Sequence, residues 1–287
     1  MLTPWEFWQD LWNPLLAFLP RALLVAVLCS LVAGVIGTHV VLRGMAFIGD
    51  AVAHAVFPGL AIAFWLQGSL VLGGLVAGLV TAILIAIVSQ NRRVKEDSVI
   101  GIFFAGAFAL GIVLISRVPG YAGSLQQFLF GSITGINDQD VTVVVLTTVT
   151  VVAVALLLHK EFMTVGLDRE MARAQRLPVL ALDLVLYVLV TVVVVISVQM
   201  IGNILVLALL VTPAATARML TDRIGIMMVL SPTIGAVAAL VGLYLSWSLD
   251  LPAGGTIVLV ATAFFALSGL VRWLRGLSGT SIQAAPA

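Results

Sequence analysis

Long apolar runs separated by short polar segments make up nearly all of the 287-residue chain. A helix needs about 20 mostly apolar residues to cross the hydrocarbon core of a membrane. The seventh run is short and contains Pro213, so eight spans with a broken or re-entrant seventh segment remain an alternative. The polar stretch 117–140 predicts a loop, with a short helix over 124–130. The pattern as a whole predicts nine spans, at 15–41, 46–66, 70–89, 99–116, 141–159, 179–201, 203–219, 225–248 and 254–273.

The composition agrees with an all-α polytopic membrane protein that forms a single transmembrane domain over 1–287. Hydrophobic residues make up 62% of the chain and charged residues 9%, whereas soluble domains carry about 25% charged residues. The net charge of +1 gives no basic field for nucleic acid. No phosphate-binding Gly-x-x-x-x-Gly-Lys-Ser/Thr motif occurs, so the chain is not expected to hydrolyse a nucleotide by itself. The single cysteine, Cys29, excludes an intramolecular disulfide.

The basic residues predict the orientation of the chain. With nine spans and an outside N-terminus, twelve Lys and Arg residues fall on one side of the membrane, and only Arg21 and Arg117 on the other. Basic residues concentrate in cytoplasmic loops, so the twelve belong in the cytoplasm. The C-terminus is then cytoplasmic as well.

The two ends of the chain differ from the spans. Residues 1–14 contain Trp5, Trp8 and Trp12, which share one face if this segment is helical. Such a face suits the headgroup region of a membrane, and a frayed tail is the alternative. The polar, Ala-rich segment 276–287 predicts a disordered tail.

Asp50 and His54 are ionisable residues inside the second predicted span. A carboxylate near the bilayer centre costs about 2.5–3.5 kcal/mol on insertion scales, so such residues usually have a function. One helical turn separates the two, which places their side chains on the same face. Pro58 cannot donate a hydrogen bond to the carbonyl of His54, so we expect a kink and a freed backbone oxygen. Gly59 permits close helix approach or local unwinding.

A carboxylate beside an imidazole predicts a site for a divalent cation. Oxygen and imidazole ligands suit manganese, zinc or iron, and the sequence does not choose among them. Asp50 and His54 alone do not complete a coordination shell, so the remaining ligands would come from other spans, a second copy of the chain or water. The alternative is that the pair bond each other and hold helices together.

Several motifs resemble the manganese/zinc permeases of ATP-binding-cassette (ABC) transporters, the ABC-3 family. The clearest is the segment 42–59, Leu-Arg-Gly-Met-Ala-Phe-Ile-Gly-Asp-Ala-Val-Ala-His-Ala-Val-Phe-Pro-Gly. Further matches follow in the same order as in the family, over nearly the whole chain. They lie at 96–111, 129–132, 207–218 and 246–254.

The resemblance implies a permease with a fold like that of type II ABC importers, located in the bacterial inner membrane. It implies a dimer with a second permease subunit, identical or paralogous, surrounded by membrane lipid. An extracellular metal-binding lipoprotein would deliver the metal, and a cytoplasmic ABC ATPase dimer would hydrolyse ATP. Asp50 and His54 would then bind the transported manganese, zinc or iron, with no permanently bound cofactor and no enzymatic activity of the chain itself.

The cytoplasmic loop 160–178 contains a charged segment that predicts a short helix. Asp168 suits its N-cap, with Glu170 in the first turn, and Pro178 ends it. From the charge pattern alone a solvated connector is the alternative.

The resemblance implies instead that this segment is the coupling helix that contacts the ATPase. The family pattern is roughly Asp-x-Glu-x-Ala-x-x-x-Gly, and Arg176 stands where glycine is usual, which leaves the geometry of the turn open. The residues assigned to this contact are Asp168, Arg169, Glu170, Ala172, Arg173 and Arg176.

Other polar residues near the cytoplasmic side receive structural interpretations. We expect Glu96 and Asp97 to form a solvated cluster, because they follow a basic run. Asp183 lies near the end of the sixth span and suits interfacial contact or helix pairing. His39, at the inner end of the first span, is interpreted as a packing residue or a helix-to-helix hydrogen bond in preference to a contact with the metal ion.

Three functional alternatives remain open. A proton-coupled secondary metal transporter could use Asp50 and His54 to relay protons. A siderophore- or vitamin-type ABC permease fits the architecture, although it does not need an Asp/His pair in the membrane. An intramembrane metalloenzyme would need more ligands, and no His-Glu-x-x-His motif occurs.

Overall fold

The computed structural model describes residues 3–90, 94–117 and 135–279, and all regular elements in these ranges are helices. Nine of the described helices are long and apolar enough to cross a membrane, which confirms the predicted number of spans. The nine are α2 (Phe18–Leu42), α3 (Ile48–Trp65), α4 (Leu70–Val88), α5 (Glu96–Ile115), α7 (Asp138–Leu157), α10 (Val179–Ile201), α11 (Asn203–Leu220), α12 (Ile224–Leu249) and α13 (Ala253–Gly279).

The seventh span, α11, is an unbroken helix that passes through Pro213. The broken segment considered from the sequence is therefore not found. Proline removes only one backbone hydrogen bond from a helix, and α11 is held in place by packing against α2, α12 and α13. The turn before it is made by Gly202, whose φ of 84° allows α11 to follow α10 directly.

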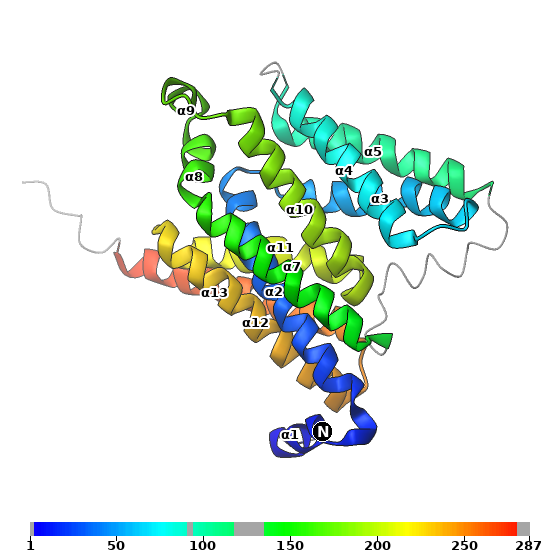
Figure 1. The fold of residues 1–287 in the computed structure, drawn as a ribbon. Helices are drawn as coiled ribbons and strands as arrows, with labels where there is room; N and C mark the ends of the chain where they lie inside the picture. The colour runs from blue at the N-terminus through cyan, green and yellow to red at the C-terminus, as the bar shows by residue number, and fades with distance from the viewer. Residues whose placement is uncertain (1–2, 91–93, 118–134, 280–287) are drawn as a thin grey trace, which may run out of the picture.

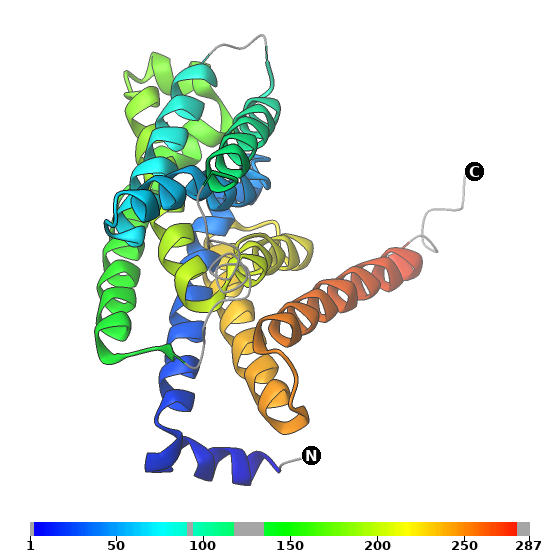
Figure 2. The same ribbon diagram turned by 90° about the vertical axis from the view of Figure 1, so that its right-hand side faces the viewer.

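Two groups of helices meet along α10, which packs against α3 and α4 of one group and against α2, α7 and α11 of the other (Figure 1). In one group α3 packs against α4 and α5, and α4 also packs against α10. In the other group α2 packs against α7, α11 and α12, while α13 lies at the edge of the molecule (Figure 2). The helices α2, α3 and α10 are the most buried, whereas α5, α7 and α13 expose most of their apolar side chains. Such outward apolar faces suit contact with lipid or with another membrane subunit.

Small residues bring the central helices close together. A Cβ atom on Gly34 would lie 2.5 Å from the Cα of Pro232, and one on Gly37 would lie 1.9 Å from the carbonyl oxygen of Leu210. Ser231 also donates a hydrogen bond of 2.8 Å to the carbonyl of Gly34. Lipid gives no hydrophobic drive for helices to associate, so close backbone packing and such hydrogen bonds hold α2 to α11 and α12.

The N-terminal segment forms a short helix, α1 (Pro4–Leu11), followed by a 3-10 turn at Pro14–Leu16. Thr3 and Glu6 form a capping box, in which the backbone N–H of Thr3 donates to the Glu6 carboxylate and lowers the pKa of that carboxyl. Phe7 is buried against Tyr244 of α12. The location of α1 in the headgroup region stays a prediction. The indoles expected to face the headgroups are all exposed, at Trp5, Trp8 and Trp12.

Two predicted segments fall partly or wholly outside the described residues. The short helix expected over 124–130 lies outside them. Helix α13 continues to Gly279, inside the segment 276–287 for which the sequence predicts a disordered tail. The last eight residues of that tail, 280–287, are also outside the described ranges.

Candidate metal site and coupling helix

Asp50 and His54 lie on the first two turns of α3 and contact each other. Nδ1 of His54 is 3.0 Å from Oδ1 of Asp50 and 2.9 Å from the backbone oxygen of Asp50. Their side chains are 29% and 17% exposed, so the pair is partly buried. The two side chains thus bond each other, as the structural alternative also expects, and this contact lies within α3.

Aromatic rings surround the imidazole of His54. The ring centroids of Phe104 and Phe108, both on α5, are each 5.1 Å from that of His54, and Phe57 is 5.6 Å away. The rings fix the orientation of the imidazole and exclude water from part of its surface. Since Nδ1 is directed at Asp50, Nε2 is the nitrogen that can bind a metal ion.

Pro58 and Gly59 shape the helix one turn beyond His54. Helix α3 is continuous through Pro58, although the proline has no N–H to donate to the carbonyl of His54. Gly111 of α5 accommodates this turn, since a Cβ there would lie 3.2 Å from Cδ of Pro58. Gly59 makes the close approach expected from the sequence, because a Cβ on it would lie 2.0 Å from the carbonyl oxygen of Gly73 in α4.

The described part of the chain holds no group of three or more His, Cys, Asp or Glu side chains that could bind a metal ion together. Asp50 and His54 are thus two candidate ligands on a partly exposed face. A site of this kind can gain further ligands from water or from another subunit placed against α3 and α5.

The loop 160–178, which the sequence predicts to be cytoplasmic, folds into two short helices, α8 (His159–Leu167) and α9 (Arg169–Ala174) (Figure 1). Asp168 is the N-cap of α9, as expected from the sequence, and its carboxylate accepts from the backbone N–H groups of Glu170 (2.8 Å) and Met171 (3.1 Å). Ala172 is fully buried, and Arg173 pairs with Glu170 at 3.6 Å on the exposed surface. The helix is therefore short, capped and anchored on one side.

Arg176 lies just after the C-cap of α9, Gln175, in the turn that ends the helix. Its φ is 60°, in the left-handed region, and the N–H of Leu177 bonds back to the carbonyl of Ala172 at 3.0 Å. This hydrogen bond is characteristic of a helix end in which glycine is preferred. The turn that the family pattern assigns to glycine is thus formed here by an arginine. A left-handed backbone at a non-glycine residue costs about 1–2 kcal/mol.

Replacing Arg176 by Gly is expected to raise the free energy of unfolding by about 1 kcal/mol, because the left-handed strain is removed. The matched control is Arg173→Gly within the same helix, which should lower that free energy by about 1 kcal/mol. Thermal denaturation of the purified protein in detergent measures both. Two variants shifted in the same direction would contradict this explanation.

The expected solvated cluster at Glu96 is wrong. The Glu96 side chain is only 21% exposed, and its two oxygens lie 3.0 and 3.1 Å from Nη2 of Arg169. Asp183 is completely buried and contacts both Arg43 and Arg169. These contacts join residues far apart in the sequence, so local charge patterns did not reveal them. The one available signal was the presence of a carboxylate, Asp183, inside an otherwise apolar span.

His39 is a packing residue, as one of the two interpretations held. It is buried, and its ring lies edge-on to the rings of His159 (5.3 Å) and Phe162 (5.4 Å).

Comparison with known proteins identifies the family. The ABC 3 transport family matches residues 16–272. This chain belongs to that family.

Relatives of this ABC-3 chain agree along most of its length. It is 41% identical over 252 residues to the manganese transport system membrane protein MntC of Halalkalibacterium halodurans, covering 88% of this chain and 86% of that protein. It is 36% identical to the chelated iron transport system membrane protein YfeD of Yersinia pestis, over 88% of this chain and 84% of the relative. The solved structure of PsaBC from Streptococcus pneumoniae in complex with an Fab superposes with a TM-score of 0.80 at 36% identity, covering 93% and 95% of the two chains.

Family membership and the nine apolar helices of the described ranges make this chain a permease of the bacterial inner membrane that crosses it several times. The resemblance noted in the sequence, and the expected all-helical fold, are confirmed.

Proposed function

We propose that this permease is the membrane-spanning subunit of an ATP-driven importer of divalent metal ions, with manganese as the first candidate. The single observation that carries the proposal is the Asp50–His54 pair, held at 3.0 Å on a partly exposed face of a buried span. Several relatives named for manganese transport support the choice of metal. The relative named for chelated iron transport makes iron the second candidate.

In this proposal Asp50 and His54 bind the metal ion transiently during its passage. The carboxylate supplies a hard oxygen and the imidazole supplies Nε2, which suits manganese, iron or zinc. A second permease subunit, identical or paralogous, completes the site by placing its own ligands opposite α3 and α5. Because two ligands per chain bind weakly, the ion can also leave, which transport requires.

The remaining partners follow from the same proposal. A cytoplasmic ATPase dimer contacts α9 through the exposed residues of that helix and supplies the energy. An extracellular metal-binding lipoprotein delivers the ion on the opposite side. The N-terminus is then outside the cell and the C-terminus in the cytoplasm, as the distribution of basic residues predicts.

Uptake of ⁵⁴Mn²⁺ by cells that lack their own manganese importers tests the proposal. The chain, expressed with its ATPase and lipoprotein, should restore uptake. A Lys→Ala change in the phosphate-binding motif of the ATPase should abolish that uptake. Uptake that continues without ATP hydrolysis and collapses with an uncoupler would support a proton-coupled secondary transporter instead. Competition by unlabelled zinc and iron would rank the substrates.

A further inference from the structure

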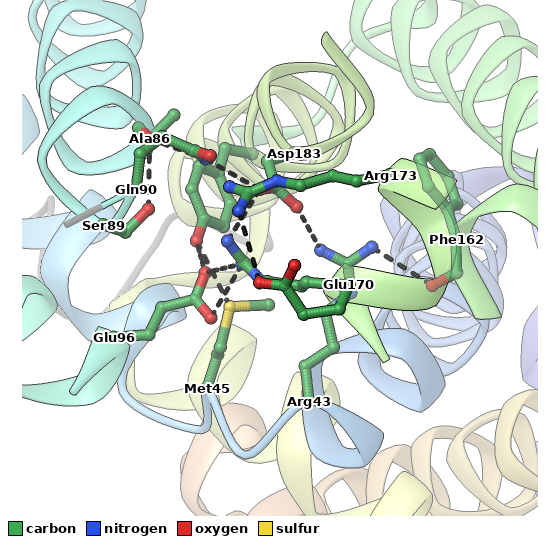
Figure 3. Close-up of polar contacts among 12 residues, drawn as sticks. Arg43, Met45, Ala86, Ser89, Gln90, Glu96, Phe162, Glu170, Arg173 and Asp183 are labelled. Carbon is green, nitrogen blue, oxygen red and sulfur yellow. Dashed lines mark hydrogen bonds and ion pairs between the residues drawn. The ribbon is translucent and has the colours of Figure 1, made fainter. Parts of the chain in front are cut away.

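A network of buried charges surrounds Asp183 at the predicted cytoplasmic end of α10 (Figure 3). One carboxylate oxygen of Asp183 is 2.7 Å from Nη1 of Arg43. The other accepts from Nε2 of Gln90 at 3.1 Å and lies 3.2 Å from Nη1 of Arg169. The side chains of Asp183 and Arg43 are 0% and 4% exposed, so this pair is separated from bulk water.

Arg169 joins this centre to a second carboxylate. Its Nη1 contacts Asp183, while its Nη2 contacts both oxygens of Glu96. The hydroxyl of the buried Tyr187 donates to Glu96 as well. Arg169 is the first residue of α9, Glu96 begins α5, and both Asp183 and Tyr187 belong to α10. A single guanidinium therefore ties the coupling helix to two spans.

The network also reaches the start of α3. Arg43 ends α2 and donates a second hydrogen bond, at 3.2 Å, to the carbonyl of Phe162 in α8. The sulfur of Met45, which is fully buried, contacts the Tyr187 hydroxyl at 3.4 Å. Arg43 and Met45 stand in the short link between α2 and α3, and α3 begins at Ile48. Asp50 is only two residues further.

Two features connect a movement of α9 to the beginning of α3. Removing one partner from a buried ion pair is strongly unfavourable, so the buried carboxylate and its guanidiniums are expected to move together. The link between α2 and α3 is only five residues long, from Arg43 to Phe47. We therefore expect a displacement of α9 to reach the beginning of α3 through Asp183 and Arg43.

We propose that Arg169, Asp183, Glu96 and Arg43 are positioning residues that transmit the movement of the coupling helix to the metal-binding turn of α3. This inference rests on the proposed function, since it requires a metal at Asp50 and His54 and an ATPase at α9. It adds the physical connection between these two sites. The connection works in both directions, so nucleotide binding changes the affinity for metal, and metal changes the affinity for nucleotide.

Arg169→Gln is the sharpest test, carried out on the complete importer in liposomes. The substitution removes only the link from α9, because Asp183 keeps Arg43 and Gln90 as partners and Glu96 keeps Tyr187. The amount of Mn²⁺ transported per ATP hydrolysed is expected to fall at least about 10-fold, within the range of typical coupling factors. Arg218→Gln is the matched control, because Arg218 forms only an exposed pair with Asp222 at 3.4 Å on the same side of the molecule.

The variant Glu96→Gln distinguishes two roles of Arg169: transmitting the movement of α9, and contacting the ATPase directly. Glu96 is on α5 and not on α9, so its loss reproduces the effect of Arg169→Gln only if the pair itself transmits the movement. The double variant should then be no worse than either single variant. If Arg169→Gln fails to assemble, Glu96→Gln alone must still lower the ratio of Mn²⁺ to ATP.

A binding measurement decides between a transmitting and a merely structural role. Mn²⁺ affinity is measured with and without a non-hydrolysable ATP analogue. The wild type should show a difference of about 5–150-fold, and both variants should show nearly none while still binding Mn²⁺. Variants that keep the wild-type difference, or that lose transport and ATP hydrolysis in parallel, overturn the inference. Wild-type uptake of Mn²⁺ by variants that lack Asp50 or His54 would instead overturn the proposed function.

Discussion

Replacing Asp50 by Asn or His54 by Ala is expected to lower manganese uptake at least about 100-fold, because even residues that only orient metal ligands contribute 10–100-fold to affinity. His54→Ala removes one of the two ligands that the proposal assigns to this chain, and Asp50→Asn removes the negative charge of the other while keeping nearly the same shape. Uptake of ⁵⁴Mn²⁺ by cells expressing the complete importer measures the effect. Immunoblots of membranes should show unchanged amounts of permease, since both side chains are partly exposed and their bond lies within α3.

The control for this experiment is Asp222→Asn. Asp222 is 89% exposed and pairs only weakly with Arg218, so the same chemical change there should leave uptake unaffected. Calorimetry or electron paramagnetic resonance of Mn²⁺ measures binding directly. Binding should be weaker in Asp50→Asn and His54→Ala, and unchanged in Asp222→Asn. Wild-type accumulation of manganese in either variant would remove Asp50 and His54 from the transport path.

Gly59→Ala is expected to lower the free energy of unfolding by about 1–3 kcal/mol, the usual cost of overpacking. The new methyl group would lie 2.0 Å from the carbonyl oxygen of Gly73 and 2.6 Å from the Cβ of Ala77. A backbone carbonyl cannot rotate away, so α3 and α4 must separate. Because α3 carries Asp50 and His54, the same change should reduce uptake.

Gly225→Ala is the matched control for the packing effect. Gly225 also lies in a helix, but nothing is within 4 Å of the position of its added Cβ. Alanine is favoured over glycine in helices, so this variant should be as stable as the wild type or slightly more stable. Thermal denaturation of the purified complex compares the two variants. Equal denaturation temperatures for Gly59→Ala and the wild type would show that the contact with α4 can yield.

The sequence predicted the spans closely because one physical condition decides them. A helix inside a bilayer satisfies its own backbone hydrogen bonds, and about 20 apolar residues are then enough. The predicted 179–201 is the observed α10, and the predicted 203–219 differs from α11 by one residue. The proline in the seventh span suggested the alternative of a broken segment, but α11 stays helical and packs against α2 and α12.

The candidate site was predictable because it is local. Residues four apart on a helix lie on one face, so the contact between Asp50 and His54 follows from their spacing. The cap of α9 at Asp168 follows from equally local rules. By contrast, no local rule brings Phe104 and Phe108 of α5 against the imidazole.

The sequence by itself thus determined the helices, their number in the described ranges and the contact between Asp50 and His54 on α3. Only the tertiary structure decided that Glu96 is not solvated and that Arg43, Asp183 and Arg169 meet. The reason is that hydropathy and capping act over one or two helical turns. These buried ion pairs depend on how four separate segments pack, and the separation of those segments along the chain leaves no periodic signal.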